Sequence, residues 1–327
     1  MPARDAARTV RAAAASILRQ TERDLALVCV DDGSRDGTLA ALESLAARDR
    51  RVVVVRGPGE GIARALNRGL ARCDAQLVAR MDADDVAHPE RLALQRALLE
   101  ADPTLAAAGS RVRLFPRAAV RSGMARYAAW LNGLVTPALV RRDLFVEAPL
   151  VHPASMIRRA PLEREGGWRD GDFPEDYELW LRLSAAGHAL TNVPRALLAW
   201  RESPGRATRQ DPRYALARHL ALKAHFLARG PLAGRREIAV WGAGDTGKAL
   251  CDALAPEGIR PVLFVEVDPK KIGRTIRGAP VVGYRDLAQA RGLPLVVAVG
   301  APGARDLIRA ELVSAGFLET RDFWCAS

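Results

Sequence analysis

The sequence predicts a mixed α/β protein built from two successive units in which short apolar strands alternate with helices. Three observations support this. Strand patterns such as "LALVCVDD" and "RVVVVRG" alternate with helical patterns such as "GIARALNRGL" near the start of the chain. The rhythm is lost between Phe115 and Trp200, and it resumes at Glu237 with "EIAVWGAGDTGKAL". Such alternation builds a parallel or mostly parallel sheet with helices on both faces.

Each element of the first unit follows from its own pattern. Short apolar runs predict three strands, at 25–32, 51–57 and 75–85, the last of which ends in acids. Apolar residues at helical spacing predict four helices, at 6–20, 37–47, 61–73 and from Pro89 onward. The tryptophan-bearing stretch after Phe115 is expected to cover the strand ends and to hold an acceptor.

The composition limits the kinds of partner. With 327 residues the chain is long enough for two modest domains that each bury a core. Its formal charge of +11 at pH 7 favours anionic partners such as nucleotide diphosphates or anionic lipid. No basic cluster is interleaved with aromatic residues, so nucleic-acid binding is not expected.

The sequence shows no sign of a membrane span or of export. No apolar run approaches the roughly 18 residues that cross a bilayer, and no signal-peptide pattern is present. The four cysteines form no C-x-x-C pair, which fits a reducing compartment. We expect a cytoplasmic protein whose membrane contact, where it has any, is peripheral and at the inner face.

Acids crowd the end of one predicted strand. In "LVARMDADDVAHPERL", Asp82, Asp84 and Asp85 follow an apolar run. Ligands of such sheets collect at the carboxyl ends of strands. Two carboxylates separated by one residue can bind a hard cation, Mg²⁺ or Mn²⁺, which clamps a diphosphate leaving group. The alternative is an acidic turn in which Asp85 caps the helix that starts near Pro89.

Two further acid pairs stand in similar places. Asp31 and Asp32, in "VCVDDGSRDGT", end another strand expected in the same sheet, although Asp and Gly also form ordinary turns. Glu175 and Asp176, in "FPEDYELWLRL", open a predicted helix, where acids are favoured even without catalysis. The three clusters together favour a site.

Taken in order, these motifs resemble the inverting family 2 glycosyltransferases, which have the GT-A fold. The resemblance covers residues 1–202 and rests on "MPARDAARTV", "DDGSRDGT", "GIARALNRGL", "DADD", "HPASMIRR" before "GGW", and "EDYELWLRL". It implies a donor nucleotide site at Pro2, Arg4, Asp31, Asp32, Asp82, Ala83 and Asp84. It implies metal contacts from Asp84, Asp85 and His152. It implies acceptor or supporting roles for Glu175, Trp180, Arg182 and Arg201.

The resemblance also implies individual roles. Asp32 would read the base of a nucleoside diphosphate sugar, and Asp176 would be the general base that takes the proton of the acceptor hydroxyl. Inversion needs one such base and charge stabilisation at the diphosphate. The helix N-terminus and nearby cations such as Arg182 are expected to keep Asp176 ionised. A structural histidine remains the alternative for His152, and a solvated arginine remains the alternative for Arg201, which would approach the diphosphate.

The sequence departs from the family at its start. The family has an apolar strand ahead of an aromatic residue and an asparagine, whereas this sequence begins at "MPARD" with Arg4 and Asp5 in those places. Either the start site is assigned too late, or the chain has lost its first strand. The first reading is favoured.

The last part of the chain predicts a second domain over 235–327, after a linker over 203–234 that contains a helix. "VWGAGDTGKAL" places Gly242, Gly244 and Gly247 in a G-x-G-x-x-G pattern between a strand and a helix. Glu266 or Asp268 follows where a ribose-binding acid is expected. The segment resembles the Rossmann-like nucleotide-binding domain that precedes sugar acyltransferases. The alternative is a scaffold or a homodimerisation domain.

Two functions of different classes follow. The first is a metal-dependent glycosyltransferase that moves a sugar from a nucleoside diphosphate sugar, such as a UDP-sugar, to a hydroxyl of a glycan or lipid-linked acceptor during cell-surface polysaccharide biosynthesis. The second is a non-catalytic nucleotide-binding or regulatory protein that acts through the C-terminal domain. A nicotinamide-dependent oxidoreductase is a third reading with less support.

Overall fold

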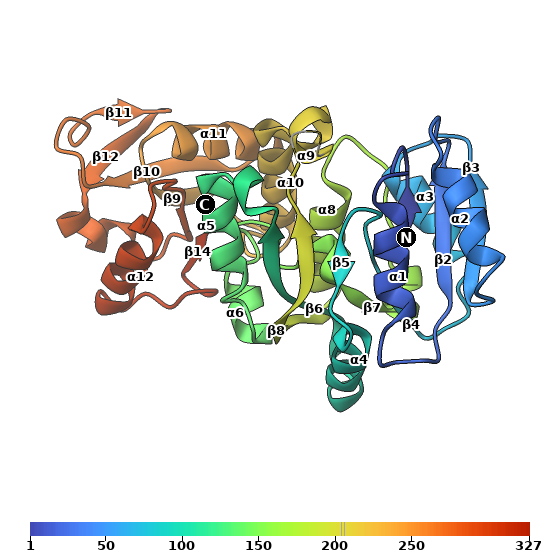
Figure 1. Cartoon of the computed structure of the whole chain (residues 1–327). Coiled ribbons are helices and arrows are strands. Elements are labelled where there is room, and N and C mark those ends of the chain that lie inside the picture. The colour runs from blue at the N-terminus through green and yellow to red at the C-terminus, as the bar shows by residue number, and fades with distance from the viewer. Residues whose placement is uncertain (204, 206) are drawn as a thin grey trace. The chain divides into compact units, whose positions relative to one another are not determined.

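The computed structural model describes residues 1–203, 205 and 207–327 (Figure 1). It divides into two compact units, and each is a mixed α/β structure, which confirms the predicted fold class. The first unit comprises Met1–Arg141, Pro149–Gly171 and Glu175–Asp211. The second comprises Arg142–Ala148, Asp172–Pro174 and Pro212–Ser327. Among the helices described, none has the length and apolar character that crossing a membrane requires.

A parallel three-stranded sheet opens the first unit. Its strands, in spatial order, are β1 (Pro2–Ala3), β2 (Leu27–Asp32) and β3 (Val52–Gly57). The helices that pack on it are α1 (Val10–Leu18), α2 (Thr38–Ala46) and α3 (Ile62–Leu70) (Figure 1). Leu27 and Cys29 share a core cluster with α1 and α2, while Val28 and Val30 pack with Ala65 of α3. Both faces of β2 are therefore covered, which explains its continuous apolar run.

A mixed five-stranded sheet, in the order β4-β7-β6-β8-β5, completes the first unit. Its strands are β4 (Leu77–Ala79), β5 (Val86–Ala87), β6 (Leu105–Phe115), β7 (Met156–Arg158) and β8 (Ala189–Arg201). The helices of this part are α4 (Arg91–Ala101), α5 (Ser122–Leu131), α6 (Pro137–Arg142), α7 (Arg159–Arg164), α8 (Glu175–Ala185) and α9 (Ala207–Gln210). Among the described strands of this sheet, β6 and β8 pair in parallel and the other pairs are antiparallel.

The prediction that the "DDGS" and "DADD" strands share one sheet is wrong. β2 belongs to the three-stranded sheet, whereas β4 pairs antiparallel with β7 in the other sheet. The three-stranded sheet ends at β1, in which only Pro2 and Ala3 are paired, with Val30 and Asp31. A two-residue strand therefore lies where the sequence led us to expect a missing strand.

The second unit contains a six-stranded sheet in the order β11-β12-β10-β9-β13-β14. Its strands are β9 (Glu237–Trp241), β10 (Arg260–Glu266), β11 (Thr275–Ile276), β12 (Ala279–Gly283), β13 (Leu295–Val297) and β14 (Phe323–Cys325). Its helices are α10 (Leu216–Arg229), α11 (Asp245–Leu254) and α12 (Ala304–Ser314). All neighbouring strands are parallel except β11 and β12.

Candidate active site

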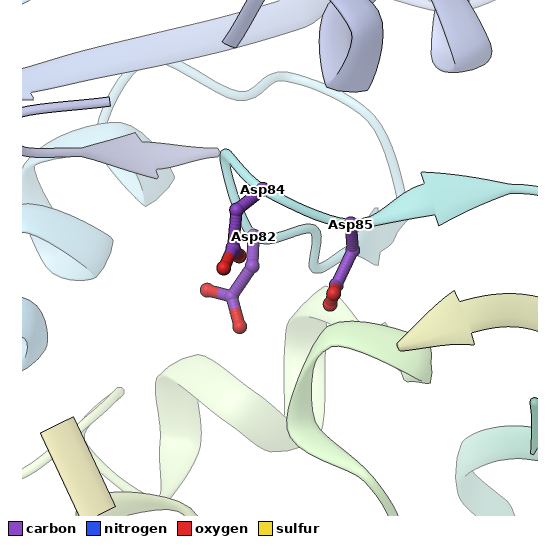
Figure 2. Close-up of side chains that lie close together, drawn as sticks. All are labelled: Asp82, Asp84 and Asp85. Atoms are coloured by element: carbon purple, nitrogen blue, oxygen red, sulfur yellow. The ribbon is translucent and has the colours of Figure 1, made fainter. Parts of the chain in front are cut away.

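The three aspartates of the "DADD" motif come together in the loop that joins β4 to β5. One carboxylate oxygen from each of Asp82, Asp84 and Asp85 lies within 4.8 Å of the others. Figure 2 shows the three side chains extending from the loop toward the same side. Burial alternates along the loop, with Met81 and Ala83 in the core and Asp82 and Asp84 partly exposed. The apolar residues thus anchor the loop and direct these acids outward.

Asp85 is almost fully buried, and its two oxygens differ. Oδ1 accepts a hydrogen bond of 2.6 Å from the backbone N–H of Arg201, whereas Oδ2 has no hydrogen-bond partner among the described residues. Burial, followed by the charge of Asp82, raises the pKa of Asp85 to about 8, although the hydrogen bond from Arg201 opposes this shift. A buried carboxylate oxygen without a partner is costly unless a cation binds it. The residues present therefore fit a divalent ion.

Arg201, the last residue of β8, supports this loop. Its Nε donates to the backbone oxygen of Asp84 at 2.6 Å, and its guanidinium lies over the ring of Phe115, 4.4 Å from the centroid. Arg201 is therefore not a freely solvated arginine. The alternative in which Asp85 caps a helix is also wrong, because α4 begins only at Arg91 and shows no side-chain cap.

Two buried arginines next to the acids were not singled out from the sequence. Arg80 has a side chain only 3% exposed and forms an ion pair with Asp82. Arg91 of α4 donates from its guanidinium to the backbone oxygens of Arg80 and Ser155, and burial lowers its pKa to about 9. The available signal was a charged residue inside the apolar run "LVARMD", since a buried arginine is expected to be paired.

Asp32 ends β2, and its carboxylate is used within the protein. Oδ1 accepts hydrogen bonds from the backbone N–H groups of Gly59 and Glu60, and Oδ2 accepts one from Gly61, at 2.8 to 3.1 Å. These bonds hold the loop that leads into α3. Asp31 is buried as well.

The other residues predicted to contact the donor nucleotide differ in their exposure to solvent. Pro2 is partly buried within β1, and Ala83 is the buried residue between Asp82 and Asp84 in the acid loop. Arg4 is exposed, and its guanidinium lies next to Gly59, 3.9 Å from where a Cβ on that residue would be. An arginine plane is thus present beside the loop that Asp32 holds.

Glu175 and Asp176 open α8, as predicted. Asp176 is partly exposed, and its Oδ1 accepts a hydrogen bond of 2.7 Å from the backbone N–H of Tyr177. Glu175 is buried instead, and its Oε1 lies 3.5 Å from Nδ1 of His152. Of the two acids, Asp176 is the one whose side chain solvent reaches.

His152 belongs to a buried aromatic cluster. Trp168 donates from Nε1 to Nε2 of His152 at 2.8 Å, and the ring of Trp180 meets the imidazole edge-on. Burial, and then the charge of Arg80, lowers the pKa of His152 to about 4, so the ring is neutral near pH 7. Trp168 occupies Nε2 of His152, and Nδ1 faces Glu175. These contacts favour a structural role for His152 over the predicted metal contact.

Arg182 and Trp180 both serve packing within the first unit. The guanidinium of Arg182 is buried and pairs with Glu178 at 2.7 Å, while it also donates to the backbone oxygen of Gly167. This differs from the expectation that Arg182 acts on Asp176. Trp180 is fully buried and donates from Nε1 to the backbone oxygen of Leu150.

The glycine-rich loop of the second unit needs two of its three glycines. Gly242 has a φ of +118°, and a Cβ there would lie 2.6 Å from the backbone oxygen of Ala298. A Cβ on Gly247 would lie 1.8 Å from the backbone oxygen of Gly242. Gly244 has an ordinary φ, and the nearest atom to its missing Cβ is Nζ of Lys271 at 3.9 Å.

The acid at the end of β10 is Glu266 rather than Asp268. Glu266 Oε2 accepts a hydrogen bond from the N–H of Ala243 in the glycine-rich loop, and its Oε1 accepts one from Val267. Asp268 lies two residues beyond the strand and accepts from the N–H of Lys270 in the following turn. Glu266 thus binds its own loop, and the nucleotide-binding role of Asp268 stays a prediction.

The mixed α/β first unit carries its acid cluster in a loop after a strand, and the comparisons identify the family. The chain belongs to glycosyl transferase family 2, whose profile matches residues 1–166. It is 30% identical over 193 residues to an uncharacterized glycosyltransferase of Haemophilus influenzae, covering 57% of this chain and 59% of the relative. It is 31% identical over 186 residues to the amylovoran biosynthesis glycosyltransferase AmsE of Erwinia amylovora, covering 56% and 66%. The chain thus spans less than two thirds of these relatives.

Solved structures share the fold. The mannosyltransferase PcManGT from Pyrobaculum calidifontis, in complex with GDP-Man and Mn²⁺, matches with a TM-score of 0.55 and 19% identity over 98% of this chain and 80% of that one. TarS of S. aureus, in complex with UDP-GlcNAc, matches with a TM-score of 0.56 and 15% identity over 77% and 70%. These matches support the GT-A architecture.

Proposed function

We propose that the chain is a metal-dependent inverting glycosyltransferase that moves a sugar from a nucleoside diphosphate sugar, such as a UDP-sugar, to a hydroxyl of a glycan or lipid-linked acceptor. The observation that carries the proposal is the cluster of three carboxylates in which Oδ2 of Asp85 is buried with no hydrogen-bond partner in the part of the chain that the structure describes. Family membership supports it, and so does a relative named for amylovoran biosynthesis. A lipid-linked acceptor would put the reaction at the cytoplasmic face of a membrane.

On the donor side, Asp84 and Asp85 would hold Mg²⁺ or Mn²⁺, and Asp82 would contact the nucleotide. The ion, when bound, supplies positive charge that stabilises the departing diphosphate. Arg201 keeps the loop in place through the backbone of Asp84. Asp32 would contribute to the nucleotide site by holding the loop at Gly59 to Gly61, beside which Arg4 lies.

On the acceptor side, Asp176 would accept the proton of the acceptor hydroxyl. As that oxygen forms a bond to the anomeric carbon, the bond to the diphosphate oxygen breaks on the opposite face, and the configuration inverts. One positioned base is sufficient for this step. The partly exposed carboxylate at the start of α8 supports the assignment.

Thermal unfolding with UDP, GDP and Mn²⁺ tests the proposal. A nucleotide that binds only the folded state raises the melting temperature by mass action, and we expect this rise to require the metal. Asp176→Asn is expected to abolish transfer and to keep the nucleotide-induced rise, whereas Glu100→Gln, an exposed acid on α4, should change neither. No response to any nucleotide in the presence of Mn²⁺ would contradict the proposal.

A second function, nucleotide binding by a Rossmann-like domain over 235–327, is favoured by the glycine-rich loop. Gly242 and Gly247 leave no room for side chains, which is the requirement of a tight strand-to-helix turn beside a phosphate. Lys271, next to Gly244, would supply positive charge there. Isothermal titration of the full chain with UDP and NAD, without added metal, tests this function, and the absence of any heat would favour a scaffold or a homodimer interface.

A further inference from the structure

We propose that Arg80 is a positioning residue of the donor site, which fixes the carboxylate of Asp82 and balances part of the charge of the acid cluster. This inference rests on the proposed function and adds a residue outside the predicted site. Arg80 stands immediately before the acid loop, one residue after β4 ends at Ala79.

The burial of Arg80 is not explained by stability. Its side chain is 3% exposed, whereas that of Asp82, with which it forms an ion pair, is 30% exposed. Nε of Arg80 is buried without a hydrogen-bond partner among the described residues, while Nη1 makes the ion pair with Asp82. A buried donor left unsatisfied costs free energy, so an apolar residue would suit this position better if packing were its only task. The ion pair thus connects a buried cation to an acid that reaches solvent.

The backbone of Arg80 is held from two sides. Its N–H donates to the backbone oxygen of Ser155 at 2.9 Å, and its own backbone oxygen accepts from Nη2 of Arg91 at 2.5 Å. Gln95, one turn further along α4, binds Nε of Arg91 at 3.1 Å. This network fixes the backbone of Arg80, so its side chain starts from a fixed position when it pairs with the carboxylate of Asp82.

The charge of Arg80 acts on both sides of the site. Burial lowers its pKa, but the charges of Asp82, Glu175 and Asp85 outweigh burial and raise it. Glu175 directly precedes the proposed base, Asp176. One guanidinium and one divalent ion together match the charge of three carboxylates, so Arg80 reduces their mutual repulsion and also sets how strongly they attract a cation.

Binding measurements on Arg80→Met and Arg80→Lys test the inference in the full chain. In Arg80→Met we expect UDP in saturating Mn²⁺ to bind about 10 to 100-fold more weakly, as when a supporting residue of a site is lost. Mn²⁺ alone, titrated into the nucleotide-free protein, should bind at least as tightly as in the wild type, because a repelling charge has gone. Arg80→Lys keeps the charge without the guanidinium, so its Mn²⁺ affinity should stay at the wild-type value and its UDP affinity should be intermediate. Arg96→Met, an exposed arginine of α4, is the matched control.

The outcomes separate the two claims. A wild-type protein that binds no UDP in Mn²⁺ overturns the proposed function. A wild type that binds, with UDP affinity unchanged in Arg80→Met, overturns only the positioning role. Parallel losses of Mn²⁺ affinity, UDP affinity and melting temperature in both variants indicate a purely structural arginine and also overturn it. Should Arg80→Met not fold, the difference between the two affinities in Arg80→Lys decides the matter.

Discussion

Two buried carboxylates, one in each unit, differ in how the protein satisfies them. Glu266 accepts hydrogen bonds from the backbone N–H groups of Ala243, Val267 and Asp268, and Nζ of Lys271 lies 3.2 Å away. Burial alone would raise its pKa, but these bonds lower it. Asp85 accepts only one backbone N–H, one of its oxygens has no partner among the described residues, and its pKa is raised to about 8.

The difference separates structural acids from acids left available to a ligand. A carboxylate whose oxygens are saturated by its own loop holds that loop, and Asp32, with three backbone donors, belongs with Glu266 in this respect. A carboxylate that is buried and only half satisfied raises the free energy of the folded state. Asp85 is therefore the acid whose presence points to a bound cation.

The largest effect that would test this comparison is on catalysis. Asp85→Asn should lower kcat/KM for transfer by about 10²- to 10³-fold. The reason is that a charged ligand of the proposed metal ion is lost, and with it part of the stabilisation of the departing diphosphate. Glu266→Gln should leave transfer close to the wild-type rate, because its carboxylate only closes a loop of the second unit. Steady-state assays with nucleotide sugars in Mn²⁺ measure both. Equal losses in the two variants would remove the distinction.

The free energy of unfolding should fall more in Glu266→Gln than in Asp85→Asn, the reverse of the order expected for catalysis. Glu266→Gln replaces one accepting oxygen by a donor that faces backbone N–H groups, which should cost about 1–3 kcal/mol. Asp85→Asn should cost less, because with a pKa of about 8 the carboxyl is mostly protonated at pH 7 and one of its oxygens has no partner among the described residues to lose. Urea unfolding at pH 7 without metal measures both, and Glu311→Gln, an exposed acid of α12, is the control. A greater loss in Asp85→Asn would reverse the argument.

Sequence reasoning found what depends on neighbours along the chain. Asp82, Asp84 and Asp85 occupy three of four successive positions, so one loop brings them together, and the start of α8 at Glu175 follows from helical periodicity. The alternation of strands and helices likewise predicted the α/β class. The choice between Glu266 and Asp268 could not be made, because it depends on where β10 ends.

Sequence reasoning missed what depends on pairing across the fold. The ion pair of Arg80 with Asp82 requires the guanidinium of Arg80 to be buried in the core. The sequence alone does not show which acid a buried arginine pairs with. The bond from Trp168 to His152 joins residues whose contact depends on tertiary packing. The division of the first unit into two sheets depends on the pairing of β4 with β7, which no local pattern encodes.

The buried imidazole of His152 should make the stability of the first unit depend on pH. The pKa of His152 is lowered to about 4 from an ordinary 6.5, chiefly by burial, so between these values the unfolded chain binds a proton that the folded protein does not. The free energy of unfolding should therefore fall as the pH is lowered through this window, by up to about 1.4 kcal/mol per unit. His152→Gln retains an acceptor for Trp168 and should remove this component. Identical slopes in the two proteins between pH 6.5 and 4 would show that the imidazole does not contribute.

The smallest expected effect on stability is that of Lys271, the partly exposed lysine that forms an ion pair with Glu266. Its side chain is 33% exposed, and such an ion pair contributes less than about 1 kcal/mol, so Lys271→Met should reduce stability only slightly while the backbone donors still satisfy Glu266. If the glycine-rich loop binds a nucleotide, however, the same variant should lose the nucleotide-induced rise in melting temperature, because the cation beside Gly244 has gone. Lys270→Met, at the neighbouring exposed position, should retain that rise. A large loss of stability in Lys271→Met alone would mean that Glu266 depends on the ion pair rather than on the backbone, and the two acids would then differ less than their hydrogen bonds suggest.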